Sequence, residues 1–133
     1  LRQRELEGTV RVRVAANRGE AGLTFFMDER HHYDLALRRS GDTWDVLERL
    51  NIGDARAVAH SVSASSEVTL AVRMSALQYE FALELDGQPI VLGTADTRYL
   101  SSEVAGGFTG VMIGLYAVGG TAVFTDFCCE YAD

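Results

Sequence analysis

Lysine is absent from this sequence of 133 residues, and all 12 basic residues are arginine. The absence excludes functions that depend on a lysine ammonium, such as P-loop nucleotide binding, Schiff-base catalysis and kinase-type phosphate transfer. The 19 acidic residues give a net charge of −7, and no block of basic residues is present. We therefore expect no nucleic-acid partner, because nucleic-acid recognition depends on a basic patch.

Long hydrophobic runs are also absent. No apolar stretch approaches the roughly 18 residues of a membrane-spanning helix, so we expect no membrane partner. The N-terminus, Leu1-Arg2-Gln3-Arg4-Glu5, has neither the apolar stretch nor the cleavage site of a signal peptide. This favours a cytoplasmic protein, although a chain that begins without Met resembles a cut or processed fragment. The length fits a single domain, residues 1–133, which is a whole small protein or a piece of a larger one.

Cysteine and proline are rare. The two cysteines, Cys128 and Cys129, are adjacent, and a disulfide between neighbours is strained. They give neither a disulfide framework nor a zinc-binding spacing. The single proline, Pro89, suits a chain made mostly of paired strands.

Alternation of apolar and polar residues is the dominant pattern, and it predicts half-buried β-strands. In the segment Val10-Arg11-Val12-Arg13-Val14, for example, the valines fall on one face and the arginines on the other. We expect strands at Val10–Val14, Ala21–Asp28, His31–Arg39, Thr43–Ile52, Ala55–Val62, Val68–Met74, Phe81–Leu85, Ile90–Gly93, Gly110–Val118 and Ala122–Glu130. In the fourth of these, Trp44, Leu47 and Leu50 also fit a helical stripe, but one isolated helix would be unusual among so many strands.

Turn signals separate the expected strands. They are Arg18-Gly19, Ser40-Gly41-Asp42, Gly53-Asp54, Asp86-Gly87 and Gly119-Gly120. About ten short strands with turns every 8–12 residues are typical of an all-β sandwich or jelly roll. The predicted fold class is therefore all-β.

Histidines and carboxylates offer no convincing catalytic or metal site. His31 and His32 follow Asp28 and Glu29, but consecutive strand residues point to opposite faces and cannot share one ion. His60 has no partner nearby in the sequence. The acidic residues lie in no motif that assigns an acid and a nucleophile for glycoside hydrolysis, and there is no Gly-x-Ser-x-Gly. We expect no catalytic residue and no metal ligand in this chain.

A glycine-rich segment contains an unusually placed aromatic residue. The run Gly106-Gly107-Phe108-Thr109-Gly110 resembles a phosphate loop only superficially, because no Lys-Ser/Thr or helix follows it. Phe108 is flanked by small, flexible residues and is well placed to project outward. An exposed aromatic of this kind anchors a partner or stacks on a sugar.

Several segments, in order, resemble the C-terminal concanavalin A-like domain of glycoside hydrolase family 43 β-xylosidases. They are Glu20-Ala21-Gly22-Leu23-Thr24-Phe25-Phe26 with His31-His32-Tyr33, then Leu92-Gly93-Thr94-Ala95-Asp96-Thr97-Arg98-Tyr99-Leu100-Ser101, then Gly107-Phe108-Thr109-Gly110-Val111-Met112-Ile113-Gly114-Leu115-Tyr116, and more weakly Ala122-Val123-Phe124-Thr125-Asp126-Phe127. The resemblance implies a concanavalin A-like jelly-roll β-sandwich of two antiparallel sheets. It also implies a partner, the catalytic propeller of a larger β-xylosidase or arabinofuranosidase that acts in xylan degradation.

The resemblance assigns a role to the glycine-rich segment. In that family the phenylalanine of the Phe-Thr-Gly loop reaches the mouth of the active site and helps to close the sugar pocket. The matching residues here are Phe108 with Thr109, Gly107 and Gly110. The ligand of the completed pocket would be a xylo-oligosaccharide or an arabinoside, and the isolated chain would be inactive.

The sequence also departs from the family pattern. Val123 and Thr125 stand where aspartates are usual, and Cys129 stands where tyrosine is common, which argues against an ion held at those positions. We expect no cofactor. Calcium is the alternative, because many jelly-roll modules bind this ion through oxygen ligands. Two other interpretations remain open, namely an autonomous carbohydrate-binding, lectin-like module and a structural domain that forms a homo-oligomer.

Overall fold

Ten β-strands make up the fold. The computed structural model describes residues 7–53, 55–75, 77–85, 87–96 and 111–131, and these residues contain no helix, so no membrane-spanning helix is found among them. The strands are β1 (Gly8–Ala16), β2 (Glu20–Asp28), β3 (His31–Ser40), β4 (Thr43–Ile52), β5 (Ala55–Ala64), β6 (Glu67–Met74), β7 (Gln78–Leu85), β8 (Gln88–Asp96), β9 (Met112–Val118) and β10 (Ala122–Tyr131). Every expected strand is present, most of them longer than expected, and the ambiguous fourth segment is a strand.

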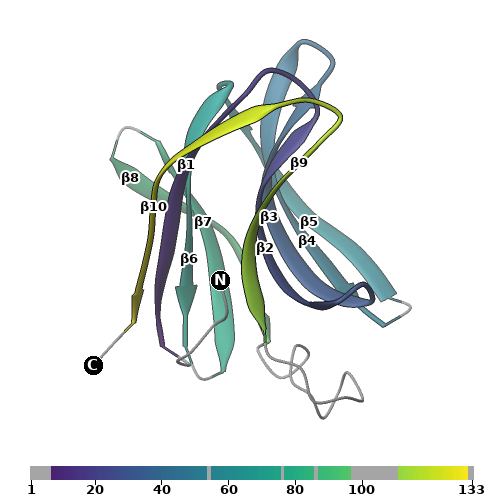
Figure 1. Cartoon of the computed structure of the whole chain (residues 1–133), viewed down its shortest axis with the longest axis vertical. Helices are drawn as coiled ribbons and strands as arrows, with labels where there is room; N and C mark the ends of the chain where they lie inside the picture. Colours follow the sequence, from purple (N-terminus) through teal and green to yellow (C-terminus); the bar gives the residue numbers. More distant parts are fainter. Residues whose placement is uncertain (1–6, 54, 76, 86, 97–110, 132–133) are drawn as a thin grey trace.

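The strands form two antiparallel sheets that face each other, as Figure 1 shows. The first, here the β1 sheet, has the order β10-β1-β6-β7-β8, and the second, here the β3 sheet, has the order β5-β4-β3-β2-β9. The prediction of a sandwich of two antiparallel sheets is confirmed. The first and last strands of the chain lie side by side in the β1 sheet.

The predicted turns are confirmed by their backbone geometry. Gly19, Gly41, Gly53, Gly87 and Gly119 all have a positive φ, between 59° and 77°, which glycine adopts at little cost. These residues end or begin the strands where the sequence predicted turns. The turn glycines therefore fix the lengths of the strands.

Two of these turns meet at one corner of the sandwich, where the chain passes between the sheets. A Cβ at Gly19 would overlap the carbonyl oxygen of Val118, and a Cβ at Gly120 would overlap that of Arg18. The Asn17 side chain accepts a hydrogen bond of 2.8 Å from the Thr121 backbone N–H. The link between β1 and β2 is thus held tightly against the link between β9 and β10.

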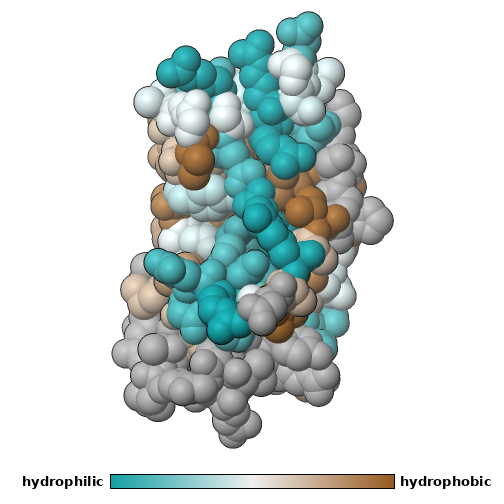
Figure 2. Space-filling model, turned by 90° about the vertical axis from the view of Figure 1, so that its right-hand side faces the viewer, coloured by the Kyte–Doolittle hydropathy of each residue, from teal (hydrophilic) through white to brown (hydrophobic). Residues whose placement is uncertain are grey.

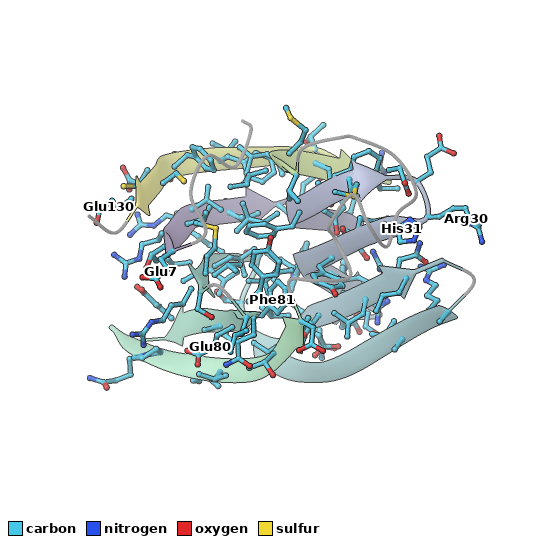
Figure 3. All side chains as sticks on the ribbon, turned by 90° about the horizontal axis from the view of Figure 1, so that it is seen from below. Glu7, Arg30, His31, Glu80, Phe81 and Glu130 are labelled. Atoms are coloured by element: carbon cyan, nitrogen blue, oxygen red, sulfur yellow. The ribbon has the colours of Figure 1, made fainter. Side chains whose placement is uncertain are left out.

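Aromatic rings from both sheets fill the centre of the core. Phe25 and Tyr33 of the β3 sheet meet Tyr79 and Phe81 of the β1 sheet, with ring centroids 4.9–6.3 Å apart. Figure 3 shows Phe81 between the sheets. The Tyr33 hydroxyl donates a 2.7 Å hydrogen bond to the carbonyl oxygen of Asp96, which satisfies its polar end.

A carboxylic acid lies at the margin of this core. Glu48 pairs with Leu35 across β3 and β4 and is only 1% exposed. Its side chain fills the space above Gly93 of β8, where a Cβ would overlap the carboxyl group. Within the described part of the chain neither carboxyl oxygen has a hydrogen-bond partner. Burial raises the pKa of Glu48 to about 7, because the charged form is poorly solvated there.

We predict that Glu48 makes the protein less stable as the pH rises from about 4.5 to 7. In this range the folded state keeps the Glu48 proton and the unfolded state loses it, so the free energy of unfolding falls by about 3 kcal/mol. Glu48→Gln keeps the shape but cannot ionise, and should remove this slope. Urea unfolding at several pH values measures the effect.

The matched control is Glu29→Gln, which changes an exposed carboxyl group at the turn after β2. It should leave the slope of the parent chain unchanged. An equal slope in the Glu48→Gln variant and in the parent chain would contradict the prediction.

Candidate functional site

The outer face of the β3 sheet carries the polar residues of its strands in register. In one row across the sheet, Thr24 of β2 pairs with Asp34 of β3, which pairs with Arg49 of β4. The next row contains Phe26 and His32. Because side chains alternate along a strand, these residues face outward while their neighbours fill the core.

Arg49 is the centre of a hydrogen-bonded network on this face. Its guanidinium donates to both carboxyl oxygens of Glu20, at 2.7 and 2.8 Å, and to Asp34 at 3.1 Å. The Tyr116 hydroxyl donates a 2.6 Å hydrogen bond to Glu20, and a His32 ring nitrogen lies 3.1 Å from Asp34. The bidentate ion pair between Arg49 and Glu20 fixes the orientation of both side chains.

Two small residues make room for this network. Glu20 pairs with Arg38 at the end of β2, yet its carboxylate reaches Arg49 past Gly22 and Ala36. A Cβ at Gly22 would overlap the carbonyl oxygen of Leu35 on the adjacent strand. Glycine is therefore required at position 22 for the close approach of β2 to β3.

The network keeps both carboxyl groups ionised. Burial raises the pKa of Glu20, but hydrogen bonds from Arg49 and Tyr116 outweigh it and hold the pKa below the ordinary 4.5. Burial likewise raises the pKa of Asp34, but hydrogen bonds from His32 and Thr24 hold it below the ordinary 3.8. Burial and the contact with Glu20 raise the pKa of Tyr116, which stays neutral. The carboxylates thus contribute stability that is lost only as the pH falls below their ordinary pKa values.

A cavity of about 440 Å³ opens above the network. Glu20, Asp34, Arg49 and Tyr116 line it from the sheet, and its remaining walls come from Thr24, Phe26, His32, Arg56 and Val118. Figure 2, which looks onto this side of the molecule, shows a band of hydrophilic residues with hydrophobic residues beside it. The arrangement can hold a small polar molecule that also has an apolar surface.

The residues predicted to close a sugar pocket, Phe108, Thr109, Gly107 and Gly110, lie outside the described residues. Their assignment stays a prediction. The segment that contains them, residues 97–110, connects β8 of the β1 sheet to β9 of the β3 sheet.

The two adjacent histidines bind different carboxylates. A ring nitrogen of His31 lies 2.9 Å from Asp28, whereas His32 contacts Asp34. In the described part of the chain no three His, Cys, Asp or Glu side chains are grouped to hold a metal ion. Cys128 and Cys129 are free thiols.

The sequence analysis missed the outer-face network. Glu20 and Arg49 are 29 residues apart, and Glu20 and Tyr116 are 96 residues apart. The available signal was the charge on Asp34 and Arg49 at the outward positions of two strands whose inward positions are mostly apolar, with Glu48 as the exception.

Replacement of Arg49 by methionine should strongly destabilise the protein. The change leaves two largely buried carboxylates without their cation and should lower the free energy of unfolding by about 3 kcal/mol. Tyr116→Phe, which removes one hydrogen bond, should cost about 1 kcal/mol. Chemical denaturation at pH 7 measures both, and an Arg49→Met variant as stable as Tyr116→Phe would contradict the prediction.

Comparison with known proteins identifies the family. Residues 1–130 match the family described as the β-xylosidase C-terminal concanavalin A-like domain. A non-reducing end α-L-arabinofuranosidase of Bacteroides ovatus, BoGH43B, is 36% identical over 102 residues, which are 75% of this chain and 19% of that protein.

Solved structures agree in fold. The Bacteroides ovatus xyloglucan PUL GH43B superposes with a TM-score of 0.80 at 30% identity, over 97% of this chain and 27% of that one. The GH43 BlXynB protein from Bacillus licheniformis superposes with a TM-score of 0.88 over 98% of this chain and 28% of that one, and at 18% identity it supports the fold alone. This chain thus spans 19–28% of the length of these relatives. With its two five-stranded sheets and its match over residues 1–130, the chain belongs to the family of β-xylosidase C-terminal concanavalin A-like domains.

Proposed function

We propose that this chain is the non-catalytic C-terminal accessory domain of a family 43 glycoside hydrolase of the β-xylosidase or α-arabinofuranosidase type. It packs on the catalytic propeller, and the loop that carries Phe108 helps to close the sugar pocket. The observation that carries the proposal is the family match over residues 1–130, in relatives that are several times longer than this chain.

The chemistry of the described carboxyl groups supports a non-catalytic role. Glycoside hydrolysis needs one carboxylic acid that holds its proton near neutral pH and a second carboxylate across the sugar. Glu20 and Asp34 line a cavity, but both have lowered pKa values and bind the same arginine. Glu48 has a raised pKa, but it is buried between the sheets. No described pair of these three combines a proton donor with access to a substrate.

The position of the Phe108 segment in the chain supports the proposal that it helps to close the sugar pocket. The loop leaves the β1 sheet after Asp96, whose carbonyl is held by Tyr33, and enters the β3 sheet at Met112. Asp96 ends β8 and Met112 begins β9, and each of these strands is the outermost strand of its sheet. The segment therefore connects one edge strand of each sheet, and the proposal places its contact with the propeller there.

The isolated chain should not hydrolyse aryl β-xylosides or aryl α-arabinofuranosides. Release of the aryl alcohol measures activity, with the full-length parent enzyme as the positive control. If hydrolysis persists after the isolated chain has been purified again, the chain carries its own catalytic groups and the prediction is wrong.

Phe108→Ala in the parent enzyme should lower kcat/KM about tenfold, because loss of an aromatic wall admits water and weakens contact with the sugar. Phe127→Ala is the matched control, since Phe127 is an exposed aromatic of the β1 sheet. Steady-state kinetics on an aryl glycoside compares the two. Unchanged kcat and KM in the Phe108→Ala enzyme would leave a structural, oligomerising role as the better interpretation.

A further inference from the structure

We propose that the cavity on the outer face of the β3 sheet is a saccharide-binding site that takes one unit of a neutral oligosaccharide. The site is built by Glu20, Asp34, Arg49, Tyr116 and Phe26. The inference is argued from described residues alone and does not rest on the accessory role proposed above.

The charges of the cavity favour a neutral ligand. Glu20 and Asp34 carry two negative charges, and Arg49 and Arg56 carry two positive charges. Both carboxylates already bind Arg49, so none is left free for a cation. Arg49 in turn is bound by both carboxylates and has little to offer an anion. A neutral ligand avoids the cost of displacing these partners.

The hydroxyl groups of a sugar suit the hydrogen-bond donors and acceptors of the cavity that the network leaves unused. A carboxylate accepts about four hydrogen bonds, and within the described residues Glu20 accepts two from Arg49 and one from Tyr116. The guanidinium of Arg56, an exposed residue at the wall of the cavity, supplies hydrogen-bond donors. Sugar hydroxyls both donate and accept, so they match a surface that presents acceptors and donors together.

An aromatic surface lies beside these polar groups. The rings of Phe26 and His32 have their centroids 5.9 Å apart at an interplanar angle of 30°. Both residues line the cavity next to Asp34, and Val118 lines it as well. A pyranose or furanose ring has an apolar face of C–H groups that packs on such a surface while its hydroxyls reach the network.

The site is rigid before any ligand arrives. The side chains of Arg49, Glu20 and Asp34 are only 12%, 13% and 6% exposed and hold one another by ion pairs. Loss of side-chain freedom is a main free-energy cost of binding. Here these side chains are already ordered in the folded chain, so binding adds little of this cost. The volume of about 440 Å³ lies within the range of small-molecule sites and suits one sugar unit of a longer chain.

The test is NMR titration of the isotope-labelled 133-residue chain with xylotetraose, a neutral oligosaccharide, and with tetragalacturonate, a uronate-bearing one. Xylotetraose should shift backbone amides of β2, β3, β4 and β9 around the cavity, with saturable binding. Tetragalacturonate should bind at least about tenfold more weakly. Absence of saturable shifts with xylotetraose, equal binding of the two probes, or shifts confined to the β1 sheet would overturn the proposal.

Variants of residues inside and outside the cavity test where the oligosaccharide binds. Phe26→Ala should weaken xylotetraose binding about tenfold through loss of the stacking surface. Arg56→Ala changes an exposed residue of the same cavity and should weaken binding about threefold, so it gives a second readout if Phe26→Ala does not fold. Arg73→Ala, an exposed arginine of the β1 sheet, is the matched control and should bind as the parent chain does. Full affinity in folded Phe26→Ala or Arg56→Ala would overturn the assignment.

The same titration separates this inference from the accessory role. Phe108→Ala should leave xylotetraose binding at the cavity unchanged, even if it lowers kcat/KM of the parent enzyme. If Phe108→Ala abolishes binding and Phe26→Ala does not, the sugar is bound by the loop and the cavity proposal is wrong. Unchanged kinetics with retained binding at the cavity would leave this inference intact and refute only the pocket-closing loop.

Discussion

Strict alternation along β3 is the constraint on which both the core and the polar network depend. Tyr33, Leu35 and Leu37 point inward and are fully buried, whereas His32 and Asp34 point outward to the cavity. A shift of one residue in register would exchange the two sets. Any change that disturbs the aromatic core therefore also disturbs the geometry of the site.

The strands and turns were predictable because their signals are local. Alternation identified every strand, and glycines marked the turns that adopt positive φ. Thr43–Ile52 was ambiguous because Trp44, Leu47 and Leu50 also fit a helical stripe, and in the structure Glu48 of this strand occupies an inward position beside an irregularity in its pairing with β5. No local pattern indicates that a carboxylic acid will be buried beneath the opposite sheet, since that outcome depends on Gly93, which is distant in the sequence.

The candidate site was less predictable, for a related reason. Its central ion pair joins β2 to β4 across β3, and its tyrosine comes from β9. Only the order of strands in the sheet brings these residues together. The glycine at position 22 offered no signal beyond its identity, although only glycine fits there against the backbone of β3. Family resemblance supplied the expectation for Phe108 and was silent about the outer face.

The placement of β1 between β10 and β6 has a consequence for synthesis of the protein. During translation β1 is made before β6 and β10, so it must wait for β6 and then for β10 before both of its edges are paired. Until then the nascent chain presents an open strand edge, which is prone to pairing with other chains. The β1 sheet is therefore complete only when β10 has left the ribosome, and loss of β10 would leave one edge of β1 unpaired.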